Sequence, residues 1–163
     1  MKQIYCLLIA EDDANDVLFL KRAFQQAEIL NPLHFVHDGQ EAIDYLSGVG
    51  IFSDRTQYPL PSLLILDLKM PRKTGMEVLK WLGEQPELRR LPVVVFTSSA
   101  HQKDVERAYQ LGANAFVVKP SSVSRRVELA KVMKGFWLDF NEPSLLSTEG
   151  LEAARKALNE TDE

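Results

Sequence analysis

The chain has 163 residues, of which 45% are hydrophobic and 26% charged, a composition typical of one globular domain with a sizeable core. Its formal net charge of -4 argues against a nucleic-acid-binding surface, and no apolar run reaches the roughly 20 residues that span a bilayer. Cys6 is the only cysteine, which excludes an internal disulfide and fits a cytoplasmic protein.

Five short apolar segments are spaced along the chain, and each predicts a β-strand. They cover residues 4–10, 33–37, 63–68, 93–97 and 115–119. The first runs directly into acidic residues, which favours a strand over a signal peptide. The last three lack polar alternation, as expected of strands buried on both faces of a parallel sheet.

Amphipathic helical patterns lie between the strands, and capping motifs mark where several helices begin. Residues 38–41, 74–77 and 99–102 match the capping-box pattern, Asp12 or Asp13 can cap the first helix, and Gly112 can end the fourth. Strict alternation of strand and helix, five times over, predicts an α/β fold with a doubly wound parallel sheet.

Two segments fall outside this alternation. Residues 48–61 form a connection that is longer than most. We place the globular domain at 1–140 and a polar C-terminal extension at 141–163, in which we expect one short amphipathic helix. The apolar positions of that helix are Leu151, Ala154 and Leu158.

Polar residues follow four of the five predicted strands, at the carboxyl end of each. They are Glu11, Asp12, Asp67, Thr97 and Lys119. Ligands of open α/β sheets bind beyond the carboxyl ends of the strands, and if the strand order is 2-1-3-4-5 these side chains converge. Converging carboxylates need a cation, and Mg2+ prefers such oxygen ligands.

This group of residues predicts phosphoryl transfer to a carboxylate. Asp67 would be the nucleophile that forms an aspartyl-phosphate. Thr97 would donate a hydrogen bond to the phosphoryl group, and Lys119 would supply positive charge. Taken singly, an aspartate at a strand end is more often a turn former or a helix cap, so the prediction depends on the joint placement.

Four stretches carry a resemblance to a known family: LLIAEDDANDV, LLILDLKMPRKTGMEVL, VVVFTSSA and GANAFVVKP. In order and spacing they resemble the signature blocks of response-regulator receiver domains, over residues 4–137. The resemblance implies a five-stranded, flavodoxin-like receiver fold of order 2-1-3-4-5. It also implies phosphorylation of Asp67 by a histidine kinase in a two-component phosphorelay. Mg2+ would be held by Glu11, Asp12, Asp67 and the backbone carbonyl of Lys69.

The same resemblance implies a switch and a cis peptide. Thr97 would move toward the phosphoryl group and let Phe116 turn inward, although Phe116 can equally be a plain core aromatic. The Lys119–Pro120 bond would be cis and would aim Lys119 inward, although an ordinary trans proline fits the same sequence. The switch would remodel the surface of the fourth helix, fifth strand and fifth helix.

The short tail after residue 137 leaves no room for an output domain, so we expect output through protein contacts. The connection before the third strand and the end GFWLDFNEP resemble the stand-alone regulators that partner bacterial phytochrome kinases. That similarity implies a phytochrome-type kinase as phosphodonor. It also implies a homodimer through the fourth helix, fifth strand and fifth helix.

Three other functions share part of this pattern. A phosphatase of the haloacid-dehalogenase type needs a second aspartate two residues after its nucleophile, where this chain has Lys69, and it places the nucleophile on its first strand. A flavodoxin-like FMN carrier needs a phosphate-binding loop where this chain has EDDAND, which repels phosphate. An unreactive pseudo-receiver would lack reactive positions that are present here. We therefore expect a signalling phosphoacceptor and no turnover enzyme.

Overall fold

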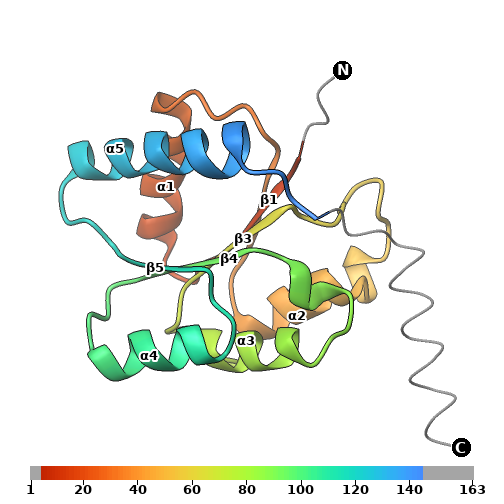
Figure 1. Ribbon diagram of the computed structural model, residues 1–163. Coiled ribbons are helices and arrows are strands. Elements are labelled where there is room, and N and C mark those ends of the chain that lie inside the picture. Colours follow the sequence, from red (N-terminus) through yellow and green to blue (C-terminus); the bar gives the residue numbers. More distant parts are fainter. Residues whose placement is uncertain (1–4, 145–163) are drawn as a thin grey trace, which may run out of the picture.

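Residues 5–144 of the computed structural model are described, and they form a sheet between two layers of helices (Figure 1). Five parallel strands follow the order β2-β1-β3-β4-β5, so the predicted fold and strand order are confirmed. The strands are β1 (Leu7–Ala10), β2 (Leu33–Val36), β3 (Leu63–Leu66), β4 (Val93–Thr97) and β5 (Ala115–Val118). Each lies inside its predicted segment, and the largest difference is at β1, which begins three residues late.

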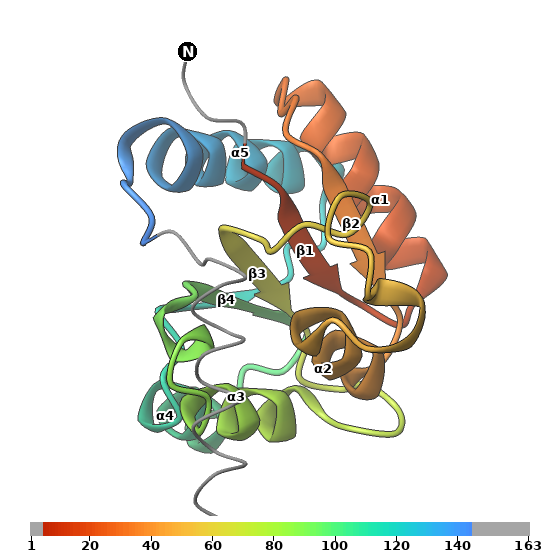
Figure 2. The ribbon, with the colours of Figure 1, turned by 90° about the vertical axis from the view of Figure 1, so that its right-hand side faces the viewer.

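Helices cover both faces of the sheet (Figures 1 and 2). One face carries α1 (Ala14–Gln26) and α5 (Val123–Met133). The other carries α2 (Gly39–Ser47), α3 (Gly75–Gly83) and α4 (Gln102–Gln110). Shorter turns are η1 (Gly50–Phe52) and η2 (Leu88–Arg90), and η3 (Lys134–Phe140) extends α5 as a π-helix.

The alternation of side chains along the strands divides the core in two. Leu8 and Ala10 of β1 belong to the cluster under α2, α3 and α4, whereas Leu7 and Ile9 belong to the cluster under α1 and α5. Strands buried on both faces have no free polar side, so polar residues appear only where the strands end. This is why the sequence signal for the site is concentrated at the strand ends.

The predicted helix caps are partly confirmed. Thr74 and Glu77 form a full capping box at α3, and Asp13 caps α1 by accepting from the amide of Asp16 at 2.9 Å. At α2, Asp38 accepts from the amide of Glu41 at 2.7 Å, but the Glu41 carboxylate accepts from the amide of His37 and so completes no reciprocal box.

The predicted cap of α4 at Ser99 is wrong. The helix begins at Gln102 and follows His101, which makes no side-chain capping hydrogen bond. The Ser99 hydroxyl instead donates to the carboxylate of Asp104 at 2.6 Å. It therefore bonds to a side chain of the first helical turn and not to a backbone amide. Gly112, with φ of 104°, takes the left-handed turn after α4, as predicted.

The long connection after α2 is folded against the amino-terminal edge of the sheet. Arg55 donates to the carbonyls of Tyr45 and Leu46 at 2.7 and 2.9 Å, and so satisfies two carbonyls at the end of α2. The Tyr45 hydroxyl donates to the carbonyl of Pro59 at 2.8 Å. Tyr45 also packs against the ring of Phe52. This segment is therefore an ordered part of the domain.

Two expectations concern other parts of the chain. The amphipathic helix expected around Leu151 lies outside the described residues. Between residues 5 and 144, no helix is long and apolar enough to cross a membrane.

Candidate functional site: an acidic pocket at the carboxyl edge of the sheet

Backbone hydrogen bonds align the ends of neighbouring strands and so place the polar residues at these ends side by side. The amide of Asp67 donates to the carbonyl of Ala10 at 3.1 Å, which sets the end of β3 beside the end of β1. The amide of Lys119 donates to the carbonyl of Thr97 at 2.8 Å, which does the same for β5 and β4. The polar residues at the ends of β1, β3, β4 and β5 therefore lie at the same edge of the sheet.

A close backbone approach supports the segment after β3. A Cβ atom on Gly75 would lie 2.2 Å from the carbonyl oxygen of Asp67 and 2.8 Å from the Cα of Leu68. The amide of Gly75 also donates to the carbonyl of Leu68 at 3.0 Å. Only glycine allows α3 to begin this close to Asp67.

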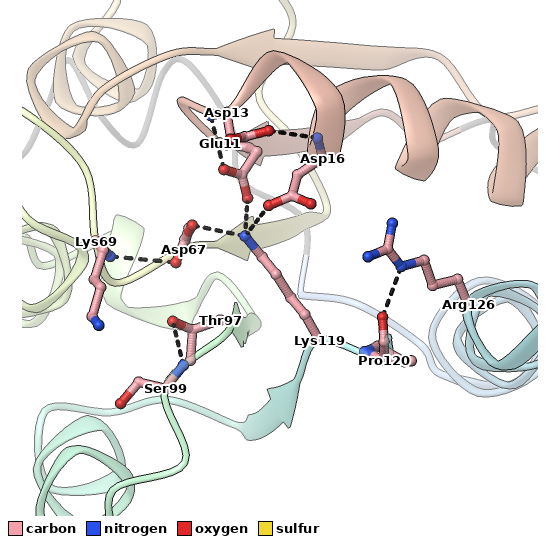
Figure 3. Close-up of polar contacts among 10 residues, drawn as sticks. All are labelled: Glu11, Asp13, Asp16, Asp67, Lys69, Thr97, Ser99, Lys119, Pro120 and Arg126. Atoms are coloured by element: carbon pink, nitrogen blue, oxygen red, sulfur yellow. Dashed lines mark hydrogen bonds and ion pairs between the residues drawn. The ribbon is translucent and has the colours of Figure 1, made fainter. Parts of the chain in front are cut away.

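The Lys119 ammonium lies at the centre of the pocket (Figure 3). Its Nζ is 2.7 Å from Glu11 Oε2, 2.9 Å from Asp67 Oδ2 and 2.8 Å from Asp16 Oδ2. The side chains of Lys119, Glu11 and Asp67 are each less than a tenth exposed. The sequence predicted the meeting of Lys119 with Glu11 and Asp67, and the structure places them in direct contact.

Three carboxylates in this pocket could hold a metal ion. Glu11, Asp12 and Asp67 each offer one oxygen, and these oxygens lie within 4.8 Å of one another. Glu11 and Asp67 are buried, whereas Asp12 is exposed. An all-oxygen set with one side open to water suits a hard cation such as Mg2+, which keeps several of its waters. The residues present therefore fit the cation predicted from the sequence.

The electrostatics of the pocket show more negative charge than one lysine can neutralise. Burial raises the pKa of Glu11 to about 7, against the opposing effect of the Lys119 hydrogen bond. Burial alone would disfavour the Lys119 ammonium, but the carboxylates of Asp16, Glu11 and Asp67 together raise its pKa above the ordinary value. A bound divalent cation would favour the charged form of Glu11.

The remaining predicted residues surround Asp67. Thr97 is fully buried at the end of β4, and its hydroxyl oxygen accepts from the amide of Ser99 at 3.5 Å. The amide of Lys69 donates to Asp67 Oδ1 at 3.3 Å. In the described part of the chain, the Lys69 ammonium forms no ion pair. Phe116 is half-buried and packs on the core under α4.

The predicted cis peptide at Pro120 is wrong. The described chain contains no cis peptide bond, so the Lys119–Pro120 bond is trans. The trans form is the intrinsically preferred one, and the long Lys119 side chain reaches all its partners from it. Arg126 Nε donates to the carbonyl of Pro120 at 2.8 Å and holds this turn against α5.

Sequence reasoning missed Asp16, the third partner of Lys119. The signal was present in the spacing. With Asp13 as N-cap, residue 16 is the third residue of the first turn of α1, next to the strand ends. An acid in that turn also interacts favourably with the helix dipole, which offers a purely structural reason for its presence.

Comparison with known proteins identifies the family. Residues 7–131 match the response regulator receiver domain. The chain belongs to the response-regulator receiver family. Members of this family are signalling proteins that pair with histidine kinases and are generally not enzymes. The predicted resemblance is thus confirmed over most of the chain.

The chain is similar to several known response regulators. The response regulator Rcp1 of Synechocystis is 31% identical over 133 residues, which cover 82% of this chain and 88% of Rcp1. Its Mn2+-bound crystal structure superposes with a TM-score of 0.78 at 29% identity, covering 86% of this chain and 99% of that one.

Two further solved structures extend this likeness. The phosphorylated cyanobacterial phytochrome response regulator RcpA has a TM-score of 0.81 at 29% identity, covering 88% of this chain and 100% of that one. RPA3017, a response regulator in red light signaling of R. palustris, has a TM-score of 0.82 at 35% identity, covering 86% and 99%. The chain is thus closely similar to phytochrome-associated response regulators.

Proposed function

We propose that this receiver accepts a phosphoryl group on Asp67 from a sensor histidine kinase and signals through the resulting change of its surface. The observation that carries the proposal is the position of the Lys119 ammonium. It lies 2.9 Å from Asp67 and 2.7 Å from Glu11, in a pocket whose carboxylates can also hold a cation. A nucleophile, a fixed positive charge and a metal site in one pocket are the parts that phosphoryl transfer needs.

The proposed reaction transfers the phosphoryl group from a phosphohistidine. An Asp67 carboxylate oxygen attacks phosphorus and forms a P–O bond, while the P–N bond breaks and its electron pair goes to the imidazole nitrogen, which takes up a proton. Lys119 neutralises charge on the phosphoryl oxygens. Mg2+, held by Glu11, Asp12, Asp67 and the Lys69 carbonyl, supplies further positive charge to those oxygens when bound.

We propose Thr97 and Phe116 as the switch. The buried Thr97 hydroxyl has only a long contact, 3.5 Å from the Ser99 amide, so moving toward a phosphoryl oxygen breaks no strong hydrogen bond. The half-buried Phe116 lies in the same core, next to α4. A charged group that attracts Thr97 would bias this packing between two arrangements.

The output surface in this proposal is α4, β5 and α5, through which two copies would form a homodimer. Two of these elements have exposed apolar side chains: Tyr109 of α4 and Val118 of β5 are 48% and 44% exposed. Apolar residues on adjoining elements are suited to association. The net charge of -4 favours a protein partner over nucleic acid.

A phytochrome-type kinase is the proposed donor, on the likeness to the phytochrome response regulator RcpA and to RPA3017, a regulator in red light signaling. The donor must dock beside Asp67, and a groove between α1 and α5 offers one contact surface. This groove has a volume of about 160 Å³ and combines apolar Phe19, Val123 and Val127 with the cations Arg22 and Arg126.

The test is a labelling experiment. Acetyl phosphate with Mg2+ should give a stoichiometric, base-labile acyl phosphate on the wild type and none on Asp67→Asn, as measured by intact mass. Labelling of both proteins would refute Asp67 as the acceptor. Continuous release of phosphate over many turnovers would instead favour a phosphatase, for which Lys69 replaces the required second acid.

A further inference from the structure

All three N–H donors of the Lys119 ammonium have carboxylate acceptors. They are Glu11, Asp16 and Asp67, at 2.7, 2.8 and 2.9 Å from Nζ. Glu11 and Asp67 also belong to the group of oxygens that can ligate a metal, and Asp16 does not. Asp16 is therefore the one partner of Lys119 that neither a metal ion nor a phosphoryl group would occupy.

The backbone holds Asp16 in a fixed position. Its amide donates to the Asp13 carboxylate at 2.9 Å, in the cap that starts α1, and it lies in the first turn of that helix. Helix α1 in turn packs against the sheet and α5. The Asp16 carboxylate thus extends from a rigid element, and its side chain is 27% exposed.

The side chains around Lys119 on this side are mostly apolar, apart from Asp16 and Arg126. A cavity of only about 10 Å³ adjoins this lysine, lined by Asp16, Phe19, Leu20, Phe96, Lys119 and Arg126. The Lys119 ammonium lies 5.8 Å from the centre of the Phe96 ring. Of the side chains that line this cavity, only that of Asp16 offers an acceptor to Lys119, so no neighbouring side chain here can replace its carboxylate.

On the basis of the proposed phosphoacceptor function, we propose that Asp16 is a positioning residue that anchors Lys119 during phosphoryl transfer. If a cation binds to Glu11 and Asp67, two of the three carboxylates that accept hydrogen bonds from Lys119 become metal ligands. Asp16 then keeps the ammonium in the pocket and leaves its other two N–H donors for the phosphoryl oxygens. Without Asp16 the ammonium samples other positions, and less of its charge is aligned with the reacting group.

The experiment compares Asp16→Ala and Asp16→Asn with the matched charge control Asp13→Asn. Asp13 also lies in the acidic segment but does not contact Lys119, and asparagine is as good an N-cap as aspartate. With acetyl phosphate and Mg2+, the limiting rate of acyl-phosphate formation and the half-saturating donor concentration are measured separately. Binding of Mn2+ to each protein is measured by calorimetry.

In Asp16→Ala the limiting rate should fall about tenfold, the effect of losing one charge-assisted hydrogen bond. The limiting rate of Asp16→Asn should lie between those of the alanine variant and the wild type, because the asparagine amide oxygen can still accept a hydrogen bond from Lys119. Asp13→Asn should react close to the wild-type rate. Mn2+ affinity should fall no further in the Asp16 variants than in Asp13→Asn, because Asp16 is not a ligand.

Wild-type rates in Asp16→Ala would overturn the anchor role, as would equal slowing in Asp13→Asn or a loss of Mn2+ affinity that matches the loss of rate. If Asp16→Ala does not fold, Asp16→Glu takes its place. It displaces the carboxylate by one methylene and must also slow the reaction several-fold, and an unchanged rate would overturn the role. A wild type that stays unlabelled would refute the phosphoacceptor function instead, so the two failures are distinguishable.

Discussion

Replacing Lys119 by methionine should destabilise the metal-free protein and increase its dependence on Mg2+. Methionine keeps most of the apolar stem but removes the ammonium that contacts Glu11, Asp16 and Asp67. Removing one partner of a buried ion pair costs about 3–5 kcal/mol because the remaining charge is uncompensated. We expect a value near about 3 kcal/mol, since Asp16 is partly exposed and Glu11 can take up a proton.

Urea unfolding at pH 7.5, followed by tryptophan fluorescence, measures this loss in free energy of unfolding. Added Mg2+ should recover much of it, because a cation bound only to the folded state contributes about 2.7 kcal/mol at 100 times its dissociation constant. The variant should gain more from Mg2+ than the wild type does, since no ammonium competes for the carboxylates. Lys103→Met, at an exposed position of α4, serves as the matched control.

Two results would refute this reasoning about Lys119. One is a loss of stability no larger than in Lys103→Met. The other is an equal Mg2+ stabilisation of the variant and the wild type, which would mean that the cation and the ammonium do not share carboxylates.

Three further predictions follow from individual contacts. In metal-free protein, the raised pKa of Glu11 means that the folded state retains a proton that the unfolded state loses, so stability should fall as pH rises from about 4.5 to about 7. Glu11→Gln should lack this part of the slope in urea titrations run at several pH values. Asp38→Ala should cost about 1 kcal/mol at pH 7 because α2 loses its N-cap. Burial acts to raise the pKa of Asp38, but the hydrogen bonds from Arg72 and the Glu41 amide together hold it below its ordinary value. The penalty should therefore disappear only as pH falls through that lowered pKa, and a penalty independent of pH would contradict this. Gly75→Ala should reduce both stability and acyl-phosphate yield, because its Cβ would lie 2.2 Å from the Asp67 carbonyl oxygen, and normal labelling of a stable variant would contradict this.

The strand order was implied by the family resemblance, whereas the meeting of Glu11, Asp67 and Lys119 could be predicted from that order for a physical reason. Buried parallel strands tolerate polar residues only at their ends, so the polar residues mark the edge at which they converge. Asp16 was not found because it comes from a helix, where an acid in the first turn has an ordinary structural explanation.

The two errors have a common physical origin in local interactions that sequence patterns do not specify. The start of α4 was misplaced because the Ser99 hydroxyl donates to Asp104 instead of capping the helix. The Lys119–Pro120 peptide was expected to be cis, but the length of the lysine side chain makes a trans bond sufficient for contact with Asp67.

The connection from residue 48 to residue 61 lies away from the acidic pocket. Arg55 fastens it to the end of α2, at the sheet edge opposite the acidic pocket. Its exposed tip, with Ile51 75% exposed, can therefore change in length and sequence while the distances around Lys119 stay the same. A change in this segment would therefore alter what the domain contacts at one edge of the sheet and leave the acidic pocket at the other edge unchanged.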